Sequence, residues 1–184
     1  MRCEAQRRDV RPGAGATYPD EVLVIRADLV DEIVAHARRD HPDEACGVVA
    51  GKIGSGRPER LVEMENAERS STFYRFDSME QLRVWREMDD LDEEPVVIYH
   101  SHTATEAYPS RTDISYAGEP GAHYLLVSTR DPRVTEVRSF SIVEGTVTEE
   151  QVNIVSAGVD PHAVQRYLFG QSPTTVDYEC PARA

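Results

Sequence analysis

The sequence predicts an α/β (α+β) fold in which a mixed, curved central β-sheet packs between helices. Short apolar runs rich in β-branched residues alternate with helix-period patterns in the order β-α-β-β-α-β-α-β-β-β. The chain has 184 residues, enough for one domain with a proper core. The two ends lack this patterning. We therefore expect a disordered N-terminal arm over 1–19, the folded domain over 20–155, and a C-terminal tail over 156–184 that is partly disordered or docked.

The first half of the pattern begins with a strand over 21–26 and a helix over 28–40. Leu29, Ile33, Val34 and Ala37 recur at helical spacing on that helix, and Pro42 ends it. The run ACGVVAG predicts a short buried strand closed by Gly51. Segments 47–53 and 59–66 then form a hairpin, since the glycines of GSGRP suit a turn.

The second half begins with a helix over 78–91, for which Ser78 and Gln81 suggest a capping box. We expect its apolar stripe of Met79, Leu82, Trp85 and Met88 to face the core. The remaining elements are a buried strand over 95–102, a loop over 103–109, a short helix over 110–119, a buried strand over 123–129, and a hairpin of 133–143 and 146–155 around Glu144-Gly145.

The most informative motif follows the pattern H-x-H-x7-S-x-x-D, from His100 to Asp113. Strand alternation places Val96, Ile98, His100 and His102 on one face, with both imidazoles at the strand's carboxyl end. Asp113 falls in the first turn of the next helix, where a carboxylate is favoured. Two imidazoles and a carboxylate are the ligand set of a catalytic zinc that keeps one position open for water.

Other interpretations of these residues need no metal. Ser110 and Asp113 alone fit a capping box, and a lone strand histidine is more often a hydrogen-bonded core residue than a ligand. The capping and metal interpretations are compatible, because a capping side chain can still face an ion. Glu44 lies where a helix gives way to a strand and is the candidate base, although taken alone it looks like an ordinary exposed glutamate.

Together these residues resemble the JAMM (MPN+) family of zinc metallopeptidases. The match includes Glu44 with Cys46-Gly47 and Gly51, together with His100, His102, Ser110 and Asp113. Weaker similarity lies at Asn66, Tyr74, Phe76 and Asp77. The resemblance implies an MPN/JAMM-like (cytidine-deaminase-like) architecture with zinc held by His100, His102 and Asp113. It further implies that Glu44 holds and deprotonates the metal-bound water, and that Ser110 steadies the oxyanion.

Segments 66–82 and 99–117 resemble the bacterial branch of the family most closely. This resemblance implies a hydrolase that acts at the Gly-Gly C-terminal tail of a small ubiquitin-like sulfur-carrier protein and releases cysteine in cysteine biosynthesis. Related members trim carrier precursors or cleave other ubiquitin-like conjugates, so these substrates stay open. A non-catalytic scaffold of the same fold is a further alternative, but it would be expected to have lost ligands that are all present here.

Composition sets limits on partners and location. The formal charge of −13 disfavours nucleic acid as a partner, and no apolar run approaches the roughly 20 residues that span a bilayer. The N-terminal arginines have no apolar run behind them, so we expect a cytoplasmic protein without a secretory signal. Cys3, Cys46 and Cys180 show no paired metal spacing, and Cys46 suits a small buried position. We expect His36, His41 and His162 at the surface and a structural role for His123.

Overall fold

A computed structural model of the chain describes residues 22–156 and 176–178. The predicted N-terminal arm, most of the predicted tail, and His162 lie outside the described residues. The described elements, in chain order, are β1 (Val22–Arg26), α1 (Ala27–Asp40), β2 (Cys46–Lys52), β3 (Arg60–Met64), α2 (Ser78–Asp90), β4 (Glu93–His102), α3 (Arg111–Tyr116), β5 (His123–Ser128), β6 (Thr135–Val143), β7 (Thr146–Val155) and β8 (Val176–Tyr178). The predicted element order is confirmed, and β8 adds a strand from the tail.

The strands form one mixed sheet in the order β1-β7-β6-β5-β4-β2-β3, with β8 paired to β6. The pairs β1–β7 and β4–β5 are parallel, and the other pairs are antiparallel. The first half of β7 pairs with β6, while residues 151–155 turn away and pair with β1. This change of partner along one strand curves the sheet, as predicted.

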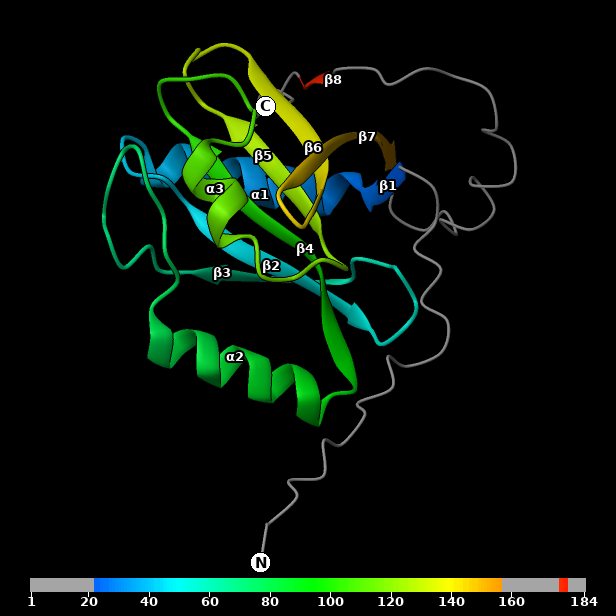
Figure 1. Cartoon of the computed structure of the whole chain (residues 1–184). Helices are drawn as coiled ribbons and strands as arrows, with labels where there is room; N and C mark the ends of the chain where they lie inside the picture. Colours follow the sequence, from blue (N-terminus) through cyan, green and yellow to red (C-terminus); the bar gives the residue numbers. More distant parts are fainter. Residues whose placement is uncertain (1–21, 157–175, 179–184) are drawn as a thin grey trace, which may run out of the picture.

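Helices cover both faces of the sheet (Figure 1). On one face, α1 buries Leu29, Val30, Ile33, Val34 and Ala37 against a core that includes Leu23, Val97 and Leu125. On the other face, Val84 and Met88 of α2 pack with Ile98, Leu126 and Phe140, and Ile114 of α3 packs against the same core. The predicted helix–sheet–helix layering is therefore confirmed. Within the described part of the chain, none of the helices has the length and apolar composition that a membrane span requires.

Both predicted hairpins are present, and their turns use positive φ angles. Gly54 and Gly56 supply φ of 72° and 61° between β2 and β3. Glu144 and Gly145 join β6 to β7 with φ of 49° and 78°, the combination that a two-residue type I′ turn requires. A glycine at the second of these positions adopts that angle without the steric cost of a Cβ atom.

The face of α2 that packs on the sheet differs from the predicted stripe. Val84 and Met88 are buried, but Met79 is 73% exposed and Leu82 is 43% exposed. Met79 and Met88 are nine residues apart, so at about 100° per residue they lie on opposite sides of the helix. The N-cap prediction was also wrong: the Asp77 carboxylate, not Ser78, accepts from the amides of residues 79 and 80.

Strand β4 contains an irregularity that strict alternation does not predict. The register with β2 shifts between Val49 and Ala50, which pair with Val97 and Pro95 respectively, so Val96 has no partner residue there. Val96 consequently packs on the α1 face together with Val97, not beside Ile98 as predicted. Beyond this bulge the alternation is regular, and it carries through to the last residue of β4.

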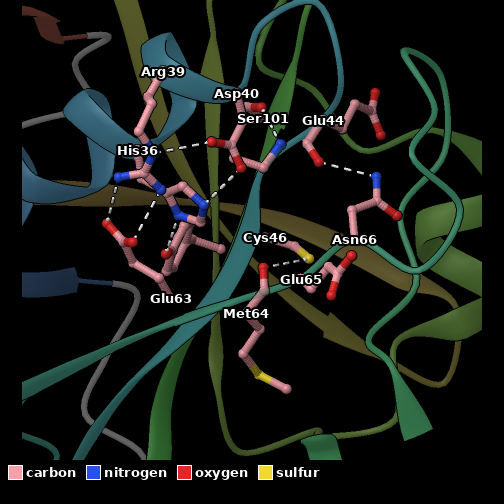
Figure 2. Close-up of polar contacts among 12 residues, drawn as sticks. His36, Arg39, Asp40, Glu44, Cys46, Glu63, Met64, Glu65, Asn66 and Ser101 are labelled. Carbon is pink, nitrogen blue, oxygen red and sulfur yellow. Dashed lines mark hydrogen bonds and ion pairs between the residues drawn. The ribbon is translucent and has the colours of Figure 1, made fainter.

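The histidine predictions were right for His41 and wrong for His36. His41 is exposed, whereas His36 is 2% exposed, with Nδ1 2.7 Å from the Tyr99 hydroxyl and Nε2 3.0 Å from the Asp40 carboxylate (Figure 2). His36 lies on the sheet-facing side of α1, where a polar partner offsets the cost of burial. His123 starts β5 and bonds Glu150 through Nδ1 at 2.7 Å, which is consistent with a structural role.

Gly47 on β2 lies where β3 and β4 approach too closely for a side chain. An added Cβ would lie 2.5 Å from both the Tyr99 hydroxyl and the carbonyl oxygen of Val62. We predict that Gly47→Ala lowers the free energy of unfolding by about 1–3 kcal/mol, measured by denaturant titration, because backbone and a buried ring must shift. Gly118→Ala is the control, since its nearest contact would be 3.8 Å away, and a change within about 0.5 kcal/mol is expected. Equal losses in the two variants would contradict this account.

Candidate metal centre

The two histidines of the motif end β4 and point to the same face of the sheet. Their Nε2 atoms are 3.2 Å apart, and both side chains are buried. His100 lies between Cys46 of β2 and Leu126 of β5 in the sheet, and His102 lies beside Ser128 of β5. The neighbouring strands therefore fix the backbone from which both rings project.

Asp113 completes the group from the first turn of α3. Its Oδ2 atom is 3.4 Å from Nε2 of His100 and 3.4 Å from Nε2 of His102. The Ser110 amide donates to the same Oδ2 at 2.6 Å, and the Asp113 amide donates to Ser110 Oγ at 3.2 Å. The capping box and the convergence on the imidazoles are thus both present, made by the same carboxylate.

One ligand atom from each of His100, His102 and Asp113 lies within 4.8 Å of the other two. Two nitrogens and one oxygen at this separation form a group that can hold a metal ion. The set matches the donors of open tetrahedral sites, in which three protein ligands leave a fourth position for solvent or substrate.

The site shifts the pKa values of the three side chains in different directions. Burial would raise the pKa of Asp113, but its contacts with His100 and His102 outweigh burial and hold its pKa well below the usual value. Burial lowers the pKa of His100 despite its contact with Asp113. Burial would also lower the pKa of His102, but hydrogen bonding to Asp113 and to the Glu106 carbonyl raises it above the usual value.

The loop after β4 orients the His102 ring. Nδ1 of His102 is 2.9 Å from the Glu106 carbonyl oxygen and 3.1 Å from Thr105 Oγ1. A proton on Nδ1 donated to that carbonyl leaves Nε2 as the free lone pair facing Asp113, the arrangement typical of metal-ligating histidines. The Ser128 hydroxyl donates to the Thr105 carbonyl at 2.5 Å and ties this loop to β5.

Glu44, the candidate base, is buried beside this group, although taken alone in the sequence it looks like an ordinary exposed glutamate. It is 5% exposed, and burial raises its pKa to about 7, an effect that the nearby charge of His102 opposes and that of Asp113 reinforces. A carboxyl group whose pKa lies near neutrality can both accept and release a proton at neutral pH. Desolvation combined with specific charged neighbours is typical of functional sites.

The fold of the described residues, and much of their sequence, also occur in known proteins. Residues 26–143, more than half of the chain, match the family model described as prokaryotic homologs of the JAB domain. The chain belongs to this family. The prokaryotic JAB family assignment confirms the predicted resemblance to JAMM (MPN+) metallopeptidases.

Two similar proteins and one solved structure support the assignment to this family. The chain is 74% identical over 134 residues to a protein named CysO-cysteine peptidase of Mycobacterium tuberculosis, covering 73% of this chain and 92% of that protein. It is 32% identical over 136 residues to the probable TtuB-protein conjugate cleaving protease of Thermus thermophilus, covering 73% and 86% of the two chains. The solution structure of DSY2949 from Desulfitobacterium hafniense superposes with a TM-score of 0.64 at 30% identity, covering 73% of this chain and 93% of that one.

Sequence reasoning gave no structural role to two residues that support this site. The Ser101 hydroxyl accepts from the Ala45 amide at 2.9 Å, and the Ser101 amide donates to the Ala45 carbonyl at 2.9 Å. Strand alternation already sends Ser101 to the face opposite the imidazoles, a signal that could have identified it. Tyr74, noted only for its weaker similarity, stacks on His100 with ring centroids 4.3 Å apart and planes 24° apart.

Metal affinity at this centre should depend on pH in a defined direction. A metal ion competes with protons for the imidazole nitrogens, and His102, whose pKa is raised, holds its proton to higher pH than His100. We predict that Zn²⁺ affinity falls as the pH drops through the pKa of His102, beginning above the ordinary value of about 6.5. Competition with a chromophoric chelator measures it, and His41→Gln should give an unchanged curve. An onset well below that ordinary value would contradict the assignment of His102.

Proposed function

We propose that the chain is a zinc-dependent hydrolase that cleaves a peptide bond at the C-terminal tail of a small ubiquitin-like sulfur-carrier protein, releasing cysteine in cysteine biosynthesis in the cytoplasm. One observation carries this proposal: two buried imidazoles and a buried carboxylate converge within 4.8 Å, next to a buried glutamate with a pKa near 7. This combination suits hydrolysis without a side-chain nucleophile.

Zinc fits the donor set. His100 and His102 each turn Nε2 toward Asp113, and the second nitrogen of His102 has a carbonyl partner that fixes its tautomer. Nitrogen and carboxylate donors suit this ion, and three protein ligands are the number used in catalytic zinc sites. When bound, zinc supplies a Lewis acid that polarises the scissile carbonyl and lowers the pKa of a water to about 7.

Glu44 is the group that we assign to proton transfer. Its carboxyl takes the proton of the attacking water and passes it to the departing amine. Burial leaves Glu44 5% exposed and raises its pKa to about 7, and both properties suit this exchange, because few solvent molecules compete for the proton. Ser110 Oγ accepts from the Asp113 amide, so its own hydrogen remains able to donate to the oxyanion.

The substrate proposal draws on the relatives. The Mycobacterium tuberculosis relative, 74% identical, is named a CysO-cysteine peptidase, and the Thermus thermophilus relative is named a probable TtuB-protein conjugate cleaving protease. We carry the first activity to this chain because the identity is high and extends over 73% of its length. A Gly-Gly tail is the expected sequence before the scissile bond, since residues without bulky side chains can approach a buried centre.

Incubation with a carrier protein whose Gly-Gly tail ends in cysteine, followed by intact mass, tests this function. We expect loss of one cysteine residue, abolished by chelator and restored by Zn²⁺. Glu44→Gln should keep its zinc content yet show negligible turnover, because the proton acceptor is gone while the three ligands remain. Cleavage of an isopeptide conjugate or of a precursor extension instead would favour the alternative substrates. Full turnover by the chelated protein would refute the proposal.

Ser110 and His102 should separate catalysis from metal binding. Ser110→Ala removes the proposed oxyanion donor, so turnover should fall about 10²- to 10³-fold while zinc content stays normal. His102→Ala should lose both zinc and activity, because two ligands alone hold the ion weakly. Zinc stoichiometry by mass spectrometry and turnover of the same carrier measure the two effects. An active Ser110→Ala variant would remove that residue from the mechanism.

A further inference from the structure

Asn66, which follows β3, uses its whole side-chain amide for hydrogen bonding. Its Nδ2 donates to the Glu44 carbonyl at 2.9 Å (Figure 2). The same Nδ2 donates to the Phe73 carbonyl at 3.1 Å. Its Oδ1 accepts from the amides of Glu68 at 3.1 Å and Arg75 at 3.3 Å. The residue is 8% exposed, so these four bonds satisfy both donors and both acceptor sites of the group away from solvent.

Residues 67–76, which we call the strap, contact the site at several points. The Ser70 carbonyl accepts from the Glu44 amide at 2.8 Å, and the Ser71 carbonyl accepts from the Thr103 hydroxyl at 3.0 Å. Tyr74 of the strap stacks on His100. The strap therefore lies against the segment of Glu44 and against the end of β4. Asn66 hydrogen-bonds to the backbone near both ends of the strap and also to the backbone of Glu44.

The Glu44 side chain has no comparable restraint of its own. Among residues 22–156, no hydrogen bond holds its carboxylate, and its position depends on its backbone. The backbone is fixed by Ser70 on the amide side, by Asn66 on the carbonyl, and by Ser101 through the next residue. Of the three, only Asn66 joins the Glu44 carbonyl to the strap through a side chain.

We propose that Asn66 is a positioning residue that sets where the Glu44 carboxylate lies relative to His100, His102 and Asp113. The proposal rests on the proposed function for its catalytic consequence, but its structural content is independent of any substrate. The four hydrogen bonds of the Asn66 side chain go to backbone groups and not to His100, His102 or Asp113, so its loss should leave the metal in place. A displacement of about 1 Å at a catalytic group can cost about 10²-fold in rate.

Asn66→Asp is the sharpest variant, because it keeps size and Oδ1 but replaces the donor with an oxygen facing two carbonyls. Turnover (kcat) on the cysteine-bearing carrier should fall about 10- to 100-fold, with KM within about twofold and zinc content unchanged. Hydrogen exchange should speed up at the Glu44 amide and in the strap. Asn153→Asp is the matched control on β7, where, within the described part of the chain, the side chain accepts a hydrogen bond from Gln151 alone, and it should leave all of these properties unchanged.

Asn66→Ala is the second variant, since it removes the donor without adding a charge, and it should share the kcat loss. Normal kcat in either folded variant would overturn the proposal, and so would a rise in KM or a loss of zinc in place of the kcat loss. If neither variant folds, Asn66 is a residue of the fold and the proposal is wrong. Should the wild-type chain fail to cleave the carrier, the proposed function fails, and faster exchange at Glu44 with zinc retained still decides the positioning role.

Discussion

The antiparallel pairing of β2 with β4 is the constraint on which the site depends. Cys46 lies opposite His100, and the pairing continues one residue further through the two bonds between Ala45 and Ser101. Because side chains alternate along a strand, Ser101, which anchors the Glu44 segment, lies between His100 and His102, which face the metal centre. A slip of one residue would turn both imidazoles to the face filled by Tyr99 and α1, and the site would be lost.

The site gathers four ionisable side chains in the buried interior, where a charged group loses its hydration and so costs free energy. Glu44, His100, His102 and Asp113 are all buried or nearly so, and their pKa values move in different directions. Asp113 gains from donors on both sides, whereas Glu44 has little to offset desolvation. A cation among these ligands would offset the cost for both carboxylates. The arrangement therefore stabilises the fold less than an apolar core would, which is typical of sites retained for function.

Most of the architecture could be predicted because it follows from period and turn chemistry. The β4 run, the α1 face and the Glu144-Gly145 turn each depend on local residues, and the H-x-H motif needs only strand alternation to converge. The errors concern properties that tertiary partners set. The bulge at Val96 depends on the neighbouring strand β2, and the burial of His36 depends on Tyr99, which is 63 residues away.

The site shows the same division between local and long-range information. Its imidazole pair and its capping carboxylate could be read from adjacent residues, because both lie within fourteen positions. The burial of Glu44 could not, since the residues that hold its backbone in place, Asn66, Ser70 and Ser101, lie far from it in the sequence. The buried face of α2 was predicted wrongly for a simpler reason. Residues spaced three apart drift around a helix, so the first and last residues of the predicted stripe lie on opposite sides.

Asp113 reaches the imidazoles from the first turn of α3, where the backbone amide of Ser110 also donates to its carboxylate. In the unfolded chain the three ligands are not gathered, so an ion that prefers them favours the folded chain by mass action. With the proposed zinc bound, the apparent melting temperature of the protein would depend on the concentration of free zinc as well as on the sequence. Cellular zinc buffering would set how much of the protein persists, as well as how much of it is active.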